Sequence, residues 1–285
     1  MTAESTPLIV AFVADLMFGA RIGSTAQHLG FQARWVASKS ELGVVTKSDT
    51  SPEAPGEALH GIAGKLFQEV TRWQPALMLF DLANEAVPWQ QWIPILKSSP
   101  ATRRIPILCF GPHVNADMIN EAKRIGADAV FPRSRFAAKM PELLTQYARI
   151  QDHAAVENAC QKPLADLAER GIELFNQGEY YRCHDDLEAA WRQDTSQGRG
   201  LYRSILQVGI ALYQVRRNNY RGAMKMLLRV RQWLAPLPDT CRGVDIAAFR
   251  HNVETIHTTL LSLGPDQLHA FDWGLVQKIK WEKVP

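Results

Sequence analysis

The sequence predicts two domains: an α/β doubly wound parallel five-stranded sheet over residues 1–150, followed by an all-α helical domain over residues 151–285. The chain has 285 residues, which is the length of two domains of ordinary size. Its first half alternates short apolar runs with amphipathic stretches, which is typical of parallel strands that helices cover on both faces. Its second half has helical periodicity and no convincing strand.

Each element of the first domain has its own signal. The first strand is the run "PLIVAFVAD", which is nearly continuously apolar up to Asp15. Gly30 stops the helix that follows, and Pro88 suits the first turn of a later helix because its missing N–H is not needed there. Residues 47–58, rich in Ser, Pro and charge, predict a mobile loop. The strands are predicted at 7–15, 31–38, 76–82, 105–111 and 128–133, and the helices at 16–30, 59–73, 88–99, 115–127 and 136–150.

The second domain follows a boundary predicted at residues 151–163. Short connections between its helices favour antiparallel packing. Helices are predicted at 163–178, 179–194, 200–218, 220–234 and 245–264.

Composition excludes several classes of protein. The formal charge is +3, with 15 basic and 13 acidic residues in the first 150, so we expect neither nucleic acid nor an acidic membrane surface as a partner. The four cysteines include no C-x-x-C pair, which excludes a zinc ribbon and a thioredoxin motif, and so few cysteines fit a reducing compartment. The start of the chain has no basic region, and Asp15 interrupts its apolar run, which argues against a signal peptide. No apolar run is long enough to span a bilayer, so we expect a cytoplasmic protein.

Four candidate site residues lie where predicted strands end. They are Asp15, Asp81, Gly111 and Arg133. The carboxyl ends of parallel strands meet at one edge of a sheet, and ligands bind there.

The first domain resembles the receiver domain of bacterial response regulators over about residues 8–147. The pattern that carries this likeness is the fivefold alternation, with "LFDL" ending the third strand and "RIGADAVFPR" leading into the fifth. The resemblance implies that Asp81 accepts a phosphoryl group and that acidic residues after the first strand help to hold Mg²⁺. Here that segment offers Asp15 alone. The resemblance also implies a hydroxyl residue where this chain has Gly111, and a lysine where it has Arg133.

These departures weaken the predicted switch. One carboxylate fewer binds Mg²⁺ less well, and Gly111 has no side chain that could sense a phosphate. We therefore predict a degenerate receiver, or pseudo-receiver, that serves as an interaction or dimerisation module. Two other interpretations stay open: Asp81 is phosphorylated with Mg²⁺ at Asp15 and Asp81, or Asp81 caps the loop that follows it.

The second domain carries the run "FNQGEYYRCHDDLEAAWR" at residues 175–192. This run resembles an all-helical bacterial family, domain of unknown function 309, and the resemblance extends over about residues 164–245. It implies a fold and no activity. Asp185 stands where glutamate is usual. The matching residues are Gly178, Tyr181, His184, Glu188, Trp191, Gln207, Ala211, Asn219, Gly222, Ala223, Gly243 and Asp245.

His184, Asp185 and Glu188 share one helical face, and three interpretations follow. The first is a transition-metal site of a metal-dependent hydrolase. The second is acid–base catalysis by His184, tuned by Glu188. The third is that His184 and Glu188 are partly buried and bond to side chains on neighbouring helices, with Trp191 in the core. We favour the third, because the facing helix offers no metal ligand of the usual kind. Its polar side chains are Gln207, Tyr213 and Gln214.

Two further features are better explained by structure than by chemistry. Arg221, Lys225 and Arg229 form a basic row, with Arg216 and Arg217 nearby, which could bind phosphate but more often is a solvated helix face. Cys183 does not face His184, because neighbours on a helix point about 100° apart, and we expect it to be a small apolar filler.

The sequence thus predicts a regulatory or scaffolding signalling protein that acts through protein–protein contacts, without a cofactor or a complete catalytic site. A homodimer is one assembly that this prediction allows. The alternatives are a metal-dependent hydrolase at His184, Asp185 and Glu188, and a phosphorylation-driven response regulator that uses Asp81.

Overall fold

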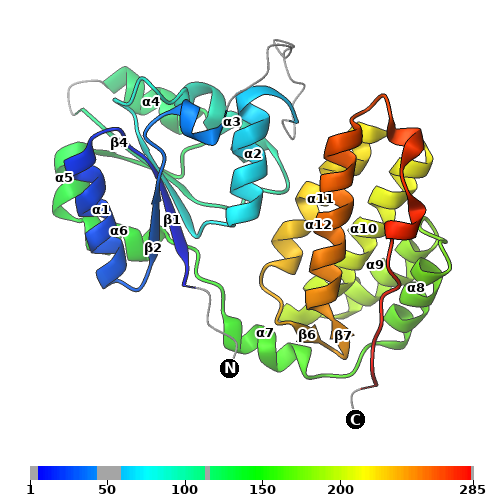
Figure 1. Cartoon of the computed structure of the whole chain (residues 1–285). Helices are drawn as coiled ribbons and strands as arrows, with labels where there is room; N and C mark the ends of the chain where they lie inside the picture. The colour runs from blue at the N-terminus through cyan, green and yellow to red at the C-terminus, as the bar shows by residue number, and fades with distance from the viewer. Residues whose placement is uncertain (1–5, 44–58, 113–115, 284–285) are drawn as a thin grey trace. The chain divides into compact units, whose positions relative to one another are not determined.

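Five parallel strands pair in the order β2-β1-β3-β4-β5 (Figure 1). In this order β1 and β3 are neighbours at the point where the winding of the sheet reverses, which is where sheets of this class bind ligands. The computed structural model describes residues 6–43, 59–112 and 116–283, and the predicted loop at 47–58 lies outside them. The chain divides into two compact units between Ile150 and Gln151. The strands are β1 Leu8–Phe12, β2 Gln32–Trp35, β3 Leu77–Asp81, β4 Ile107–Gly111 and β5 Ala129–Pro132.

Helices cover both faces of this sheet. One face packs Ile9 and Ala11 of β1 against α1, α5 and α6. On the other face Phe12 stacks on Phe80 and contacts Trp92 of α3. Side chains of both faces of the inner strands are fully buried, as in a doubly wound sheet. The predicted fold class is confirmed. The helices are α1 Leu16–His28, α2 Gly61–Trp73, α3 Trp89–Ser98, α4 Ala116–Arg124, α5 Arg133–Ala138 and α6 Met140–Tyr147.

The end of this unit differs from the prediction in two ways. The single helix predicted at 136–150 is two helices, because Pro141 suits the first turn of α6 and cannot continue α5. Arg133 does not end β5; it is the first residue of α5.

The second unit is a stack of helices, with α9 packed between α8 and α10 and α11 packed on α10 and α12. The first helix, α7, lies in the segment predicted to be only a boundary. The prediction of no strand was wrong: Thr240–Cys241 (β6) and Val244–Asp245 (β7) form a short antiparallel hairpin. Arg242 and Gly243 have positive φ at its turn, as tight hairpins require. The helices are α7 His153–Cys160, α8 Asp166–Asn176, α9 Cys183–Gln193, α10 Gly200–Arg216, α11 Tyr220–Leu234 and α12 Ile246–Leu263.

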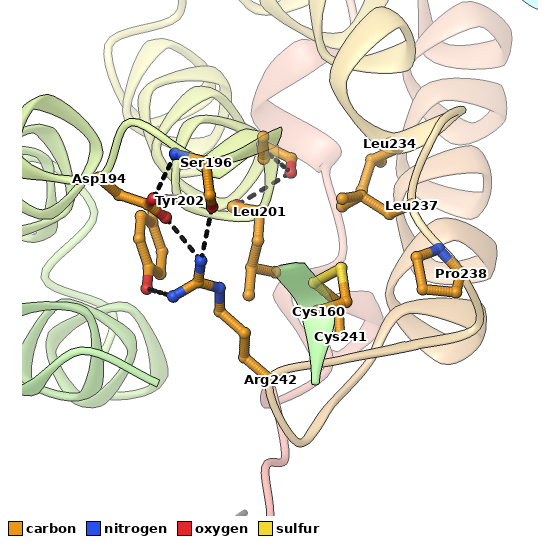
Figure 2. Close-up of a disulfide and its surroundings, with 12 residues drawn as sticks. Cys160, Asp194, Ser196, Leu201, Tyr202, Leu234, Leu237, Pro238, Cys241 and Arg242 are labelled. Atoms are coloured by element: carbon orange, nitrogen blue, oxygen red, sulfur yellow. Dashed lines mark hydrogen bonds and ion pairs between the residues drawn. A yellow bond between two sulfur atoms is a disulfide. The ribbon is translucent and has the colours of Figure 1, made fainter. Parts of the chain in front are cut away.

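A disulfide between Cys160 and Cys241 joins the end of α7 to β6 across 81 positions of sequence (Figure 2). The sequence did not predict it. Because disulfides are rare in reducing compartments, cysteine usage no longer supports such a compartment. Cys109 and Cys183 are free and buried.

Arg242, next to this disulfide, is a buried charge whose two terminal nitrogens both have partners, whereas its Nε has none among the described residues (Figure 2). Its guanidinium bonds to Asp194 at 2.7 Å, Ser196 at 3.0 Å and the Tyr202 hydroxyl at 2.7 Å, and its backbone N–H donates to the Cys160 carbonyl. Such pairing is what makes a buried guanidinium tolerable. The hairpin turn is thus tied to α7, to α10 and to the segment after α9.

The last described part of the chain, residues 264–283, is called the strap below. It contains two short 3₁₀ turns, Leu268–Ala270 (η3) and Trp273–Leu275 (η4), and then runs without regular structure to an isolated antiparallel bridge between Trp281 and Val244. Within the part of the chain that the structure describes, none of the helices combines the length and apolar content that a membrane crossing requires.

Candidate functional site

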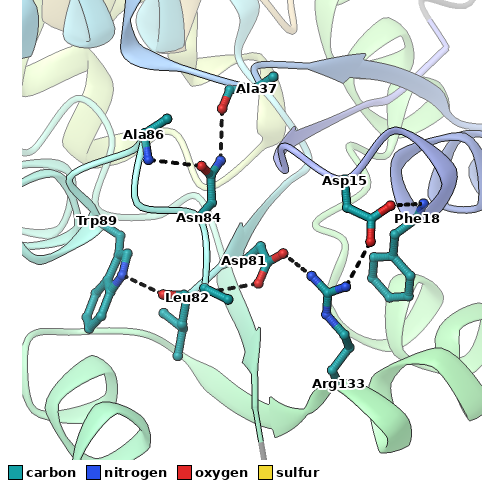
Figure 3. Close-up of polar contacts among 10 residues, drawn as sticks. Asp15, Phe18, Ala37, Asp81, Leu82, Asn84, Ala86, Trp89 and Arg133 are labelled. Carbon is teal, nitrogen blue, oxygen red and sulfur yellow. Dashed lines mark hydrogen bonds and ion pairs between the residues drawn. The ribbon is translucent and has the colours of Figure 1, made fainter.

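Asp15, Asp81 and Arg133 meet at the carboxyl edge of the sheet, beside the switch point between β1 and β3 (Figure 3). Asp15 follows β1, Asp81 ends β3, and Arg133 follows β5. We call these three residues the carboxylate latch. The guanidinium of Arg133 lies between the two carboxylates and donates to both, one nitrogen to each.

Asp15 holds the outer side of the latch. Its Oδ1 accepts the Phe18 N–H at 3.0 Å, so it caps α1, and its Oδ2 lies 3.0 Å from Arg133 Nη1. The pKa of Asp15 is lowered, first by the Phe18 N–H and then by Arg133. Asp15 therefore stays ionised.

Asp81 holds the inner side and is almost fully buried, with 4% of its side chain exposed. Its Oδ1 accepts the Ala83 N–H at 3.1 Å, and its Oδ2 pairs with Arg133 Nη2. Burial raises the pKa of Asp81, while the Ala83 N–H and Arg133 oppose the rise. Both oxygens of this carboxylate already have partners.

Aromatic rings hold Arg133 in this position. Its guanidinium lies 4.7 Å from the centre of the Phe18 ring and 5.8 Å from that of Phe110. A planar cation between rings and carboxylates loses little further freedom when it binds them. The latch is therefore pre-organised by β4 and α1.

The position of Gly111 is covered. A Cβ atom placed there would lie 3.1 Å from the Leu82 Cβ, which is tighter than ordinary contact. The β3–α3 loop that carries Leu82 is itself ordered: Asn84 bonds to the Ala37 carbonyl and the Ala86 N–H, and the Trp89 indole donates to the Leu82 carbonyl (Figure 3).

The described residues contain no group of three or more His, Cys, Asp or Glu side chains placed to hold a metal. Asp15 and Asp81 bring two carboxylates together, with Arg133 between them. A guanidinium thus supplies positive charge at the place where the receiver resemblance implies Mg²⁺.

An exposed apolar pair begins α1 immediately after Asp15. Leu16 is 84% exposed and Met17 is 83% exposed, whereas Phe18 turns inward to Arg133 and Phe110. Two large apolar side chains fully in water beside a polar cluster are typical of a contact surface.

In the second unit, the structure does not gather His184, Asp185 and Glu188 into one site. His184 Nδ1 lies 3.3 Å from Asp185 Oδ1, but the Asp185 side chain is 85% exposed. Glu188 pairs with Arg192 at 2.9 Å. Both partners lie on α9 itself, so the prediction that His184 and Glu188 bond to neighbouring helices was wrong.

The facing helix uses its polar side chains elsewhere. Gln214 bonds to Asn219 at 2.9 Å, and the Tyr213 ring packs against Tyr181. Gln207 is buried, and among the described residues no donor reaches its Oε1. Trp191 is only partly buried and, contrary to the prediction, does not lie in the core. The Arg203 guanidinium covers one part of it, 4.5 Å from its ring centre.

Several other signature residues shape turns and helix ends. Gly178 has φ +82° after α8, and its carbonyl accepts from Arg216. Asn219 caps α11 through the Gly222 N–H, and a Cβ at Gly222 would lie 2.6 Å from the Asn219 Nδ2. Asp245 caps α12 through the Ala248 N–H. The contacts at Gly178, Asn219, Gly222 and Asp245 thus explain why these signature residues stand at turns and helix ends.

Residues 168–226 match a family model, Domain of unknown function (DUF309). The predicted resemblance is confirmed for this region, which we call the DUF309 region. An uncharacterized protein of Aquifex aeolicus is 25% identical over 105 residues, which are 36% of this chain and 32% of that protein. The uncharacterized protein YpuF of Bacillus subtilis is 33% identical over 57 residues, 20% of this chain and 33% of that protein. The match thus spans about a third of the length of these relatives.

Solved structures similar to the chain include response regulators. The phosphorylated cyanobacterial phytochrome response regulator RcpA has a TM-score of 0.37 and 12% identity, over 50% of this chain and 94% of that one. A response regulator receiver domain from Rhodospirillum rubrum has a TM-score of 0.36 and 18% identity, over 50% and 95%. The receiver-like fold of the first unit, predicted from the sequence, is confirmed by the strand order and the helices on both faces.

The basic row of α11, formed by Arg221, Lys225 and Arg229, is only partly solvated, contrary to prediction. Arg221 is exposed, at the start of α11, but Lys225 and Arg229 are half-buried and have partners of their own. Cys183 is buried and donates its S–H to the Tyr180 carbonyl; burial raises its thiol pKa to about 12. It fills the space beneath Gly209, where a Cβ would lie 2.8 Å from its Sγ.

Sequence reasoning missed Leu16, Met17 and the residues that bind the strap. The apolar periodicity of α1 is that of an ordinary amphipathic helix, so the sequence does not set Leu16 and Met17 apart from its core residues. Only their exposure in the structure does so. Asn176 and Asn252 bind the strap by their amide groups, and a lone asparagine gives no signal in a sequence.

Proposed function

We propose that this chain is a regulatory or scaffolding protein that acts through protein–protein contacts, and that phosphorylation of Asp81 does not switch its receiver-like unit. The carboxylate latch carries this proposal. Arg133 neutralises the charge that a metal ion would neutralise, and it binds Asp81 where a phosphoryl donor would have to reach it.

Three positions of the receiver-like unit disfavour a phosphorylated Asp81. A phosphoryl group on Asp81 would displace Arg133 from that carboxylate. Asp15 would then be the one other carboxylate of the latch that could hold Mg²⁺. At Gly111 the phosphate would meet no hydroxyl group, because Leu82 lies against that glycine. None of these three positions would therefore stabilise a change of conformation that depends on the phosphate.

The test exposes the full chain to Mg²⁺ with acetyl phosphate or beryllofluoride. We expect no gain of mass at Asp81 and no fluorine signal of a bound adduct. The matched control is the double variant Ala14→Asp, Arg133→Lys, which adds the second carboxylate and opens the latch, and which should take up beryllofluoride. Stoichiometric modification of the unaltered chain at Asp81 would overturn the proposal.

The contact surface we propose is the apolar pair Leu16–Met17. Exposed apolar side chains become stabilising only when a partner covers them. The variant Leu16→Ser, Met17→Ser should lose a partner that the unaltered chain captures from its own cells, whereas Leu261→Ser, which changes another exposed leucine, should keep it. Capture of the same proteins by both variants would contradict this surface.

We also propose that the protein works in the cytoplasm and binds neither membranes nor nucleic acid. Disulfides in that compartment are transient or redox-sensing. We expect rapid alkylation of intact cells to find the Cys160–Cys241 bond open in a measurable fraction of molecules. A bond that is complete in every molecule would argue for an oxidising compartment.

A further inference from the structure

The strap is bound mainly through its backbone. Asn252, buried on α12, donates its amide N–H to the Leu275 carbonyl at 2.7 Å and accepts the Gln277 N–H at 3.1 Å. Asn176, at the end of α8, donates to the Ile279 carbonyl and accepts the Ile279 N–H, both at 2.8 Å. Each asparagine thus acts as a substitute for a neighbouring strand.

The hairpin also binds the strap through its backbone. Trp281 pairs with Val244 of β7 as an antiparallel bridge, and the Glu282 N–H donates to the Gly243 carbonyl at 3.0 Å. A Cβ at Gly243 would lie 1.9 Å from the Glu282 carbonyl oxygen, so the two backbones touch.

The positions bound by the two asparagines repeat with a period of two. Residues 275, 277 and 279 turn backbone groups toward Asn252 and Asn176, as alternate residues of an extended strand do, and at the hairpin the backbone bond comes from Glu282. Elements far apart in sequence, α8, α12 and β7, supply that surface. Recognition by main-chain hydrogen bonds with pockets for a few side chains is the way in which proteins bind extended peptides.

Two side-chain anchors give this surface its selectivity. The Trp273 ring stacks on Tyr180, with ring centres 5.9 Å apart, and Arg216 lies over both rings. Ile279 is 5% exposed. Asn176, Tyr180 and Arg216 all belong to the DUF309 region, whereas the strap lies outside it.

We propose that this face of the helical unit is a binding groove for an extended peptide and that the strap occupies it in cis. The partner is a polypeptide segment in extended form, with an aromatic residue six positions before a branched aliphatic residue, which replaces the strap. The groove is separate from the carboxylate latch, and its test does not depend on the state of Asp81.

The tether sets the strength of this competition. A segment joined to its own binding site by a short connection has an effective concentration in the millimolar range. A free peptide therefore binds weakly while the strap is attached through Gly264 and Pro265.

The test converts the strap into a free ligand. A specific protease site is inserted between Pro265 and Asp266 in the full chain, the folded protein is cleaved, and the released segment is removed by dialysis. A fluorescent peptide with the sequence of residues 268–283 then reports binding by anisotropy. We expect its apparent affinity to increase about a hundredfold on cleavage.

Three results would overturn the proposal. Loss of helical circular dichroism on cleavage would make the strap a permanent part of the fold. A cleaved segment that does not exchange for the labelled peptide would do the same. Intact chains that exchange straps and form dimers would make a second copy, and not a separate partner, the occupant.

Two matched pairs test backbone recognition. A peptide with an N-methyl group on the Ile279 nitrogen should bind about tenfold more weakly, because one donor is lost while the side chain stays, and a peptide with Gln277→Ala should bind normally. In the protein, Asn176→Ala should weaken binding about tenfold, whereas Asn84→Ala, which removes a similar amide from the other unit, should not. Equal affinity for the N-methylated and unmethylated peptides would refute backbone recognition.

Discussion

Arg133 determines the electrostatic state of the receiver-like unit. It pairs with an exposed carboxylate, Asp15, and with a buried one, Asp81, and these two are not equivalent. An exposed pair contributes little to stability, whereas a buried carboxylate without its partner is strongly unfavourable. The consequences of losing Arg133 are therefore felt through Asp81.

We predict that Arg133→Ala lowers the free energy of unfolding of the first unit by about 2–4 kcal/mol, because Asp81 is left buried without its cation. Urea unfolding followed by tryptophan fluorescence measures this. Arg135→Ala, which removes a more exposed arginine two positions on, is the control and should change stability by under about 0.5 kcal/mol. Adding Asp81→Asn to Arg133→Ala should recover part of the loss; no recovery would show that Asp81 is not the cause.

His257 makes the second unit sensitive to acid. It is buried beside Arg231 and Glu254, and burial, helped by Arg231, lowers its pKa from 6.5 to about 4. The folded state thus favours neutral His257, while the unfolded chain binds a proton as the pH falls below about 6.5. Stability is full above that pH and is lost as the pH falls toward 4.

We predict that the free energy of unfolding of the helical unit falls by at most about 3 kcal/mol between pH 6.5 and pH 4, and that His257→Gln removes most of this fall. Denaturant unfolding at half-unit steps of pH measures it. His251→Gln, at an exposed position of the same helix, should leave the slope unchanged. The same slope in the His257→Gln variant would assign the effect to another group.

Among the elements, the connection of α7 to β6 combines a disulfide with a buried arginine. Closing a loop of 81 residues restricts the unfolded chain strongly, and the chain-entropy model gives about 4.5 kcal/mol for a loop of this size. The Arg242 network would hold the two elements in place after reduction.

We therefore predict that reduction of the Cys160–Cys241 bond destabilises the helical unit by about 2–4 kcal/mol without unfolding it. Thermal melting with and without dithiothreitol measures the change. Cys160→Ser should lose the response to dithiothreitol, and Cys183→Ala, at a free buried cysteine of the same unit, should keep it. A response that survives in the Cys160→Ser variant would exclude this bond as its origin.

The sequence was sufficient for the strands of the sheet and most of the helices, but it missed α7 and the β6–β7 hairpin, and it was insufficient for the contacts between elements. Gly30, Pro88 and the period of apolar residues place strands and helices, because these signals are local. The latch could be anticipated, since the ends of parallel strands must meet. The pairing of Cys160 with Cys241, and of Asn176 with Ile279, depends on how distant segments pack, which no local pattern encodes.

The same distinction explains the error at His184. Helical spacing puts His184, Asp185 and Glu188 on one face, but it does not say which groups come within reach. Arg192 lies one turn beyond Glu188 on the same helix and takes its carboxylate. Because Arg192 of the same helix pairs with Glu188, no side chain of a neighbouring helix is needed to pair with this carboxylate.

At the scale of the whole molecule, the chain consists of two units with separate cores. A unit with its own buried core can fold independently. We predict that a chain ending after Ile150 keeps the near-ultraviolet circular dichroism of the first unit, including the signal of buried Trp92. Loss of that signal would show that the first unit needs the helical unit in order to fold.

The disulfide also gives the molecule an unusual response to mechanical force. If the chain is pulled from its two ends, tension passes from α7 to β6 through the sulfur atoms and bypasses the segment between them. That segment contains α8, α9, α10 and α11, with the entire DUF309 region. A ring of 81 residues hides about 280 Å of extensible chain. A thiol reductant would release this length in a single step, so a covalent bond sets how far the protein can be stretched.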